Sequence, residues 1–183
     1  MSSSRCLSKG FTLIESVIVI VVMGLAMITI VSFLQPQIER SANPHYQTRV
    51  AALGQSLMTQ ILAQGFDHNS DFNGGRVRCG ETIVGETVPS CTAANDLGPE
   101  ESDVLQYNDV DDYHGCWTPE GTGGCGNLNT LLGEAQTTYQ NFRVDVVVNY
   151  PAGYNAFTIK RVLLTISASN QTPISLTAYK GNY

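Results

Sequence analysis

The chain has 183 residues, with 10 Lys and Arg against 16 Asp and Glu, which gives a formal net charge of −6. Binding to phosphate backbones needs clustered Lys and Arg, and Lys160-Arg161 is the only adjacent basic pair after the first ten residues, so a nucleic-acid partner is not expected. Once an N-terminal leader and apolar segment are set aside, about 150 residues remain, enough for one compact domain.

The first 34 residues join a short polar leader to a long apolar segment. Residues 11–34 number 24, and Glu15 is the only charged residue among them. At about 1.5 Å per residue, a helix of this length measures roughly 36 Å and can cross a bilayer. A carboxylate in such a helix costs about 2.5–3.5 kcal/mol at its centre, which makes Glu15 a candidate functional residue. Because Arg5 and Lys9 precede the segment, the positive-inside rule places the N-terminus in the cytoplasm and the later residues across the membrane.

The residues at the junction of leader and apolar segment have a specific order. Lys9-Gly10-Phe11-Thr12-Leu13-Ile14-Glu15 resembles the sequence that prepilin peptidase recognises in type IV pilins and in the pseudopilins of type II secretion. The resemblance implies cleavage between Gly10 and Phe11, N-methylation of Phe11, and an assembly role for Glu15. In an ordinary secretory signal the apolar region precedes the cut, whereas here it follows the cut and stays attached. The alternative is an uncleaved signal anchor.

Glu15 also has a physical role in such an assembly. Where apolar helices pack side by side in a filament, a buried charge needs a partner, and the amine of Phe11 on an incoming subunit is a suitable one. Forming this pair would favour transfer of the helix from the membrane into the fibre. The alternative is that Glu15 lies near the membrane interface and reaches water.

Two prolines follow the apolar segment. Gln35-Pro36-Gln37 is expected to end or kink the helix, and Asn43-Pro44 is typical of the N-cap and first turn of a new one. Apolar residues then recur at helical spacing between residues 46 and 64, before a glycine stop. The sequence therefore predicts four parts: a cleaved leader (1–10), a transmembrane and filament-core helix (11–34), a kinked periplasmic continuation (35–65) and an extracytoplasmic globular domain (66–183).

The last third of the chain has the pattern of a sheet. Apolar residues stand at every second position from 142 to 150, and the positions between them are polar except for Val147, which is the pattern of a half-buried strand. Further strands are expected at 157–167 and 174–180. Three successive strands with tight turns predict an antiparallel meander, whereas the glycine-rich residues 66–138 predict loops and short strands. The predicted fold class is α+β and pilin-like: a long, kinked, membrane-spanning N-terminal helix packed on an antiparallel sheet, with disulfide-stapled loops.

The cysteines agree with this topology. Cys6 lies in the leader, and the other four lie in the predicted extracytoplasmic part, where disulfides persist. Four cysteines allow three connectivities, and the short loops favour Cys79–Cys91 and Cys116–Cys125. A zinc site is disfavoured because the chain has no Cys-x-x-Cys pair.

Two acidic segments are weak candidate metal sites. The first places oxygen-bearing side chains at alternate positions, as at the start of an EF-hand loop: Asp67, Asn69, Asp71 and Asn73. Phe72 stands where the turn glycine should be, so we interpret this segment as a polar turn. The second, 108–115, has three carboxylates and an imidazole, and we interpret it as a loop whose acids bond backbone amides. Neither a metal nor another cofactor is expected.

Further segments resemble one group of pilins more closely. Residues 39–46, 66–79 and 108–115 are similar to minor pilins of the mannose-sensitive haemagglutinin (MSHA) pilus. The resemblance implies a subunit that initiates, caps or modifies a pilus. Its partners would be other major and minor pilins, prepilin peptidase, the inner-membrane assembly platform and, before assembly, the membrane. It would begin as a single-pass inner-membrane protein with a periplasmic domain and end in the cell-surface pilus.

Two other functions stay open at this point. A type II secretion pseudopilin shares the leader, the apolar helix and the fold. A signal-anchored periplasmic binding domain or enzyme is the other alternative, but the three histidines lie in unrelated segments and the chain lacks a Gly-x-Ser-x-Gly motif. We therefore expect no enzymatic activity.

Overall fold

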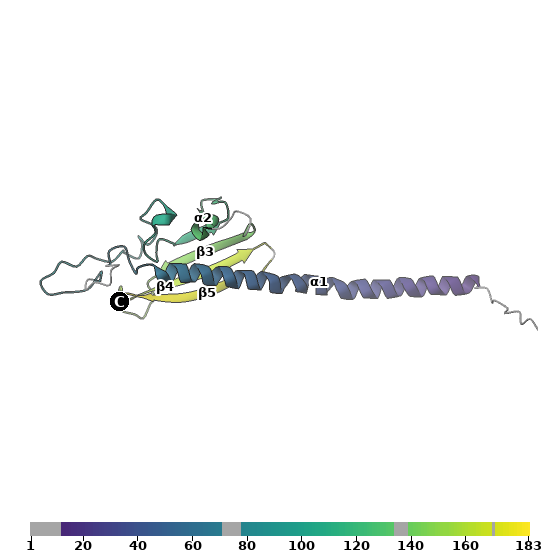
Figure 1. Cartoon of the computed structure of the whole chain (residues 1–183). Coiled ribbons are helices and arrows are strands. Elements are labelled where there is room, and N and C mark those ends of the chain that lie inside the picture. Colours follow the sequence, from purple (N-terminus) through teal and green to yellow (C-terminus); the bar gives the residue numbers. More distant parts are fainter. Residues whose placement is uncertain (1–11, 71–77, 134–138, 170) are drawn as a thin grey trace, which may run out of the picture. The chain divides into compact units, whose positions relative to one another are not determined.

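A computed structural model describes residues 12–70, 78–133, 139–169 and 171–183, with the side chains of residues 36–44 left aside. The chain divides into two compact units, Met1–Gln47 and Thr48–Tyr183, and one long helix contributes to both. In chain order the elements are α1 (Leu13–Ala63), the 3-10 helix η1 (Val104–Gln106), β1 (Gly115–Thr118), β2 (Gly126–Asn127), α2 (Leu128–Leu132), β3 (Phe142–Asn149), β4 (Ile159–Ala168) and β5 (Ile174–Gly181) (Figure 1).

Helix α1 continues through both prolines. The expected end at Pro36 and the expected new start at Pro44 are wrong, because the helix is unbroken from Leu13 to Ala63. Each proline lacks one N–H and removes a single i→i−4 hydrogen bond, so the bonds of neighbouring residues carry the helix past it. The expected kink stays a prediction.

The five strands form one sheet in the order β2-β1-β3-β4-β5. The predicted meander is confirmed, since β3–β4 and β4–β5 are antiparallel pairs, and β1 adds antiparallel to β3. The sheet is nevertheless mixed rather than fully antiparallel, because Gly126–Asn127 pairs parallel with β1. A parallel neighbour usually needs a crossover of a dozen or more residues, and the short connection here leaves room for a pairing of only two residues.

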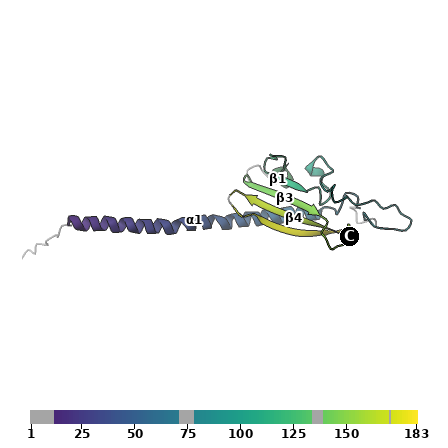
Figure 2. The ribbon, with the colours of Figure 1, turned by 180° about the vertical axis from the view of Figure 1, so that it is seen from behind.

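The core of the second unit lies between the sheet and the last turns of α1, which pass in front of the sheet in Figure 1 and behind it in Figure 2. Strand β3 alternates strictly between buried and outward-facing residues, as the sequence predicted. The side chains that meet in this layer are fully or almost fully buried: Val50, Leu53, Leu57 and Ile61 of α1, Val144, Val146 and Val148 of β3, and Val162, Leu164 and Ile166 of β4.

Gly54 allows α1 to approach the sheet closely. It lies on the buried face of the helix, and a Cβ atom added there would overlap Leu176 Cδ1 and lie 3.2 Å from Ile166 Cδ1. We expect Gly54→Val to lower the free energy of unfolding by about 1–3 kcal/mol, because the enlarged side chain forces the core apart. Urea unfolding of the variant measures this, with exposed Ala51→Val on the same helix as the control. Equal stability of the two variants would contradict the close approach.

Candidate functional site: the N-terminal helix and a buried polar cluster

The predicted cleavage site, Gly10 and Phe11, lies outside the described residues, and the description begins at Thr12. Thr12 acts as an N-terminal cap, since its Oγ1 accepts a hydrogen bond from the Glu15 N–H at 3.4 Å. Glu15 is therefore the third helical residue, and the order Thr-x-x-Glu is that of a capping box. A carboxylate in the first turn is also stabilised by the helix dipole. Glu15 thus has a local structural role beside the predicted assembly role.

The following part of α1 is not covered by other described residues. Leu13–Gln35 forms a 23-residue segment with a mean hydropathy of 3.0, none of it buried, and it is the one helix in the described residues that is long and apolar enough to cross a membrane. Its large side chains range in exposed fraction from 45 % at Val19 to 85 % at Leu13. Exposed apolar surface of this extent needs lipid or other helices to cover it.

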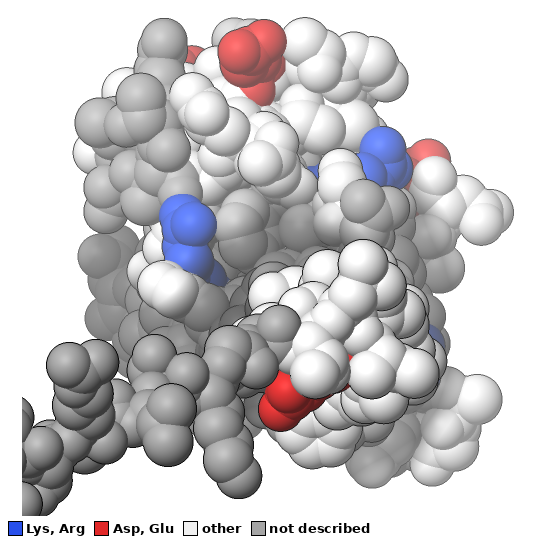
Figure 3. All heavy atoms as spheres, turned by 90° about the vertical axis from the view of Figure 1, so that its right-hand side faces the viewer, with Lys and Arg blue, Asp and Glu red and all other residues white. Residues whose placement is uncertain are grey.

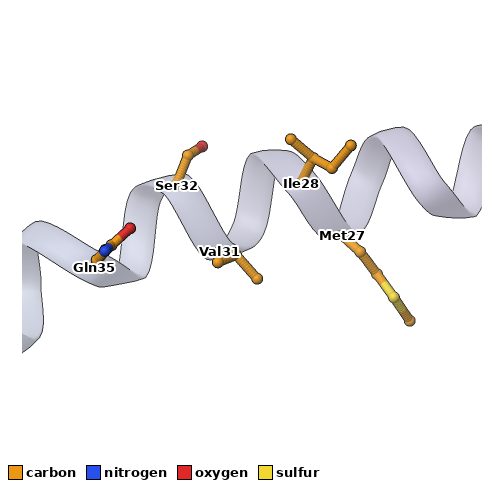
Figure 4. Close-up of a pocket in the computed structure, with 5 residues that line it drawn as sticks. All are labelled: Met27, Ile28, Val31, Ser32 and Gln35. Carbon is orange, nitrogen blue, oxygen red and sulfur yellow. The ribbon is translucent and has the colours of Figure 1, made fainter.

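A shallow groove along this helix is lined by Met27, Ile28, Val31, Ser32 and Gln35, which lie on successive turns of α1 alone (Figure 4). Ser32 Oγ donates to the carbonyl of Thr29 at 2.9 Å, so its hydroxyl is satisfied within the helix. A groove with one helix as its only wall does not enclose a small ligand, but it suits the side chains of a second helix.

Both disulfides join the cysteines that the short loops favoured. Cys79–Cys91 and Cys116–Cys125 each have a Cα–Cα distance of 4.8 Å. Cys79 and Cys91 are buried with Phe66 in a small cluster against which aromatic rings of Tyr150 and Phe157 pack. On the chain-entropy model, loops of this length contribute about 2–3 kcal/mol each.

A buried lysine joins three distant segments of the second unit. Lys160 Nζ lies 3.0 Å from Asp67 Oδ2 and also contacts Asp111 Oδ1, and all three side chains are completely buried. The ammonium group also stands 4.8 Å from the ring centre of Phe66. Sequence reasoning missed Lys160, although strand alternation places it on the inward face with Val162, two residues later. That alternation is the signal by which it could have been found.

Of the first set of metal candidates, Asp67 and Asn69 are described, whereas Asp71 and Asn73 lie outside the described residues. Asp67 Oδ1 accepts from the Asn69 N–H at 3.1 Å, and Oδ2 accepts from the Thr92 N–H at 2.9 Å and from Lys160. Burial alone would raise the pKa of Asp67, but the charge and hydrogen bond of Lys160 and the two amides outweigh it and lower that pKa. Both carboxylate oxygens of Asp67 are thus engaged within the protein.

The second acidic segment is a loop tied to the end of α1. Gly65 N–H donates to the Asn108 carbonyl at 2.9 Å, and Val110 N–H donates to the Gly65 carbonyl at 3.1 Å. Asp109 Oδ1 accepts from the N–H groups of residues 111 and 112, and Asp112 Oδ2 accepts from those of residues 108 and 109, at 2.7–3.2 Å. Two of the three acids of this segment therefore bond backbone amides, as the sequence interpretation expected, whereas Asp111 contacts Lys160.

Aromatic and imidazole side chains anchor the same loop. Tyr113 and Trp117 are buried, and Trp117 Nε1 donates to the Tyr113 carbonyl at 3.0 Å. His114 Nδ1 accepts from the Val148 N–H at 3.1 Å, which ties the loop to β3. This nitrogen is consequently occupied by strand β3.

Negative charge accumulates around this loop. Burial, followed by the charge of Asp111, raises the pKa of Asp109 to about 8. The same two causes, with Asp112 adding to them, raise the pKa of exposed Glu100 to about 7. Near-neutral pH therefore leaves protons on carboxyl groups that would be ionised in water.

The comparisons with known proteins bear on the N-terminus. Residues 5–31 match a family model described as the prokaryotic N-terminal methylation motif. No curated protein and no solved structure matches the chain. Members of families with this motif are structural pilins that prepilin peptidase processes and that assemble with other pilins. The match and the exposed apolar helix that it covers together support a type IV pilin-like protein or pseudopilin, anchored in the membrane by its N-terminal helix.

Proposed function

We propose that this chain is a minor type IV pilin, similar to MshD of the MSHA pilus, which assembles through its N-terminal helix and helps initiate, cap or modify the fibre. The observation that carries the proposal is the exposed 23-residue apolar segment of α1, which has one carboxylate in its first turn and which the methylation motif overlaps. Segments 39–46, 66–79 and 108–115 favour the MshD-like assignment.

Assembly follows from the chemistry of the cut. Cleavage after Gly10 creates an amine on Phe11, four residues before Glu15, so the amine of one subunit can pair with Glu15 of its neighbour. Repeating such a head-to-tail contact generates an open helical fibre rather than a closed ring. Major and minor pilins would supply the neighbouring helices, and the assembly platform of the inner membrane would deliver the subunit.

The location follows from the same features. The leader stays in the cytoplasm, the helix spans the inner membrane, and the domain folds in the periplasm before the subunit enters the surface pilus. Two disulfides support an oxidising compartment for that domain. On the face drawn in Figure 3, Lys and Arg side chains lie apart from one another, one of them beside an acidic side chain, which suits contacts with proteins better than with phosphate backbones.

The test is the intact mass of the full-length chain expressed with and without prepilin peptidase. We expect loss of residues 1–10 and gain of one methyl group on Phe11 only when the peptidase is present. Gly10→Val should block the cut, whereas Gly24→Val should not, since a Cβ at Gly24 meets nothing within 4 Å. If the leader stays intact although the peptidase is active, the proposal is refuted, and the chain is instead a periplasmic domain held by an uncleaved signal anchor.

A pseudopilin of type II secretion is the second candidate, supported by the same motif and helix. The two are distinguished by where the processed chain accumulates. Recovery in fibres sheared from the cell surface supports a pilin. Retention in the envelope, with a secretion defect when the chain is deleted, supports a pseudopilin.

A further inference from the structure

Five buried oxygen atoms in the segment from residue 101 to 112 have no hydrogen-bond partner. Each belongs to a side chain whose other polar atom is held by the protein, and such orphaned oxygens are uncommon in folded proteins. They are Glu101 Oε2, Asn108 Oδ1, Asp109 Oδ2, Asp111 Oδ2 and Asp112 Oδ1.

Three of these side chains are carboxylates with no exposed surface: Asp109, Asp111 and Asp112. Backbone amides hold one oxygen of Asp109 and one of Asp112, and Lys160 holds one oxygen of Asp111. The loop therefore fixes each carboxylate in place and leaves its second oxygen without a partner. Pre-positioning of this kind is what hydrogen bonds around a metal site provide.

Two of these buried carboxylates, Asp109 and Asp111, come close to a third carboxylate from the loop before them. One carboxylate oxygen from each of Glu100, Asp109 and Asp111 lies within 4.8 Å of the other two. Glu100 is exposed, so this group opens to solvent, and a second group of His68, Glu100 and Glu101 adjoins it. An ion could enter from the Glu100 side and reach the buried carboxylates.

The described residues supply little positive charge to balance this cluster. The ammonium group of Lys160 is already shared between Asp67 and Asp111. Within the described part of the chain, no other Lys or Arg forms an ion pair with these acids, and His68 contacts Glu101 only at the rim, at 3.3 Å. Carboxylates this close together repel one another, so either shared protons or a bound cation must relieve the repulsion.

We propose that Glu100, Asp109 and Asp111 bind a Ca²⁺ ion, with Asp112, Glu101 and Asn108 close by to supply further oxygen ligands. Ca²⁺ takes six to eight oxygen ligands in flexible geometry, whereas Zn²⁺ prefers nitrogen and sulfur and Mg²⁺ demands a near-ideal octahedron. Asp67 is not part of this site, because both of its carboxylate oxygens already accept hydrogen bonds from Lys160 and two backbone amides. The ion would hold the acidic loop against the end of α1 and β4.

The test uses the full chain in detergent micelles, freed of metal with EGTA and then titrated with CaCl₂ by calorimetry and thermal unfolding. We expect one bound Ca²⁺ per chain and a rise in Tm of about 5–10 °C at about 100 times Kd. MgCl₂ at the same concentration should give a clearly smaller rise.

Two variants remove a charge without removing the backbone contacts. Asp109→Asn keeps an Oδ1 that accepts the same amides, and Glu100→Gln changes an exposed side chain, so both should fold. We expect each to lose most of the Ca²⁺-dependent rise in Tm. Asp96→Asn and Glu86→Gln are the matched controls, since both are exposed and change the charge equally, and they should keep the full rise.

Three outcomes would overturn the proposal. The first is native protein that neither binds Ca²⁺ nor gains stability from it, which means that protons alone relieve the repulsion. The second is an unchanged Ca²⁺ response in Glu100→Gln and Asp109→Asn, which means that the ion acts elsewhere. The third is an equal response to Mg²⁺ or a stronger one to Zn²⁺, which excludes a Ca²⁺ site of oxygen ligands.

Discussion

We expect Lys160→Met to lower the free energy of unfolding by about 3–5 kcal/mol, because it removes one member of a buried ion pair. The methionine fills a similar volume, so the loss comes from charge rather than from a cavity. Asp67 and Asp111 would be left fully buried with no cation between them. Urea unfolding of the full chain, followed by tryptophan fluorescence of buried Trp117, measures the change.

Arg161→Met is the matched control for this variant. Arg161 is the next residue on β4, is partly exposed, and donates to Asn149 Oδ1 at 3.2 Å, so its loss should cost less than about 1 kcal/mol. Adding Asp67→Asn and Asp111→Asn to Lys160→Met should recover part of the stability, because neutral amides are cheaper to bury. A Lys160→Met protein as stable as the Arg161→Met protein would show that the carboxyl groups are already neutral.

Glu15→Gln should reduce incorporation into fibres at least about tenfold while leaving insertion and cleavage intact. The backbone N–H of residue 15 still donates to Thr12 Oγ1, and glutamine also suits the third position of a capping box, so the variant removes the charge alone. A tenfold change in incorporation corresponds to about 1.4 kcal/mol, so we expect the pair of Glu15 with the Phe11 amine to contribute at least this much to assembly. The measurement is the ratio of processed chain in sheared fibres to processed chain in the membrane.

Two comparisons isolate the charge of Glu15. Ser32→Ala removes a polar group of the same helix whose hydroxyl is satisfied internally, and it should assemble normally. Glu15→Ala also removes the carboxyl group that in a capping box accepts from the N–H of residue 12, while the bond from the residue 15 N–H to Thr12 Oγ1 stays, so any further loss beyond Glu15→Gln reports that side-chain contribution. Normal assembly of Glu15→Gln would refute the proposed pairing with the Phe11 amine and leave Glu15 as a capping residue.

Local patterns in the sequence were sufficient for the helix and for the three C-terminal strands. The apolar segment can be predicted from its length and composition alone, and β3 can be predicted from its alternating pattern alone. Both signals lie within a short stretch of the chain. The prediction that the helix ends at Pro36 and restarts at Pro44 was wrong, because a single missing N–H weakens a long helix without ending it. The parallel partner β2 was not predictable, since it pairs two residues that lie beyond a disulfide loop.

The sequence by itself was enough to recognise a prepilin-like N-terminus. The order Lys9-Gly10-Phe11, a carboxylate at Glu15 and an uncharged span after it are contiguous, so no tertiary contact is needed to recognise them. The buried polar cluster was decided only by the tertiary structure. Asp67 and Asp111 lie 93 and 49 positions from Lys160 in the chain, and which acid meets that cation, and which oxygens stay free, depends on how the helix end, the loop and β4 pack.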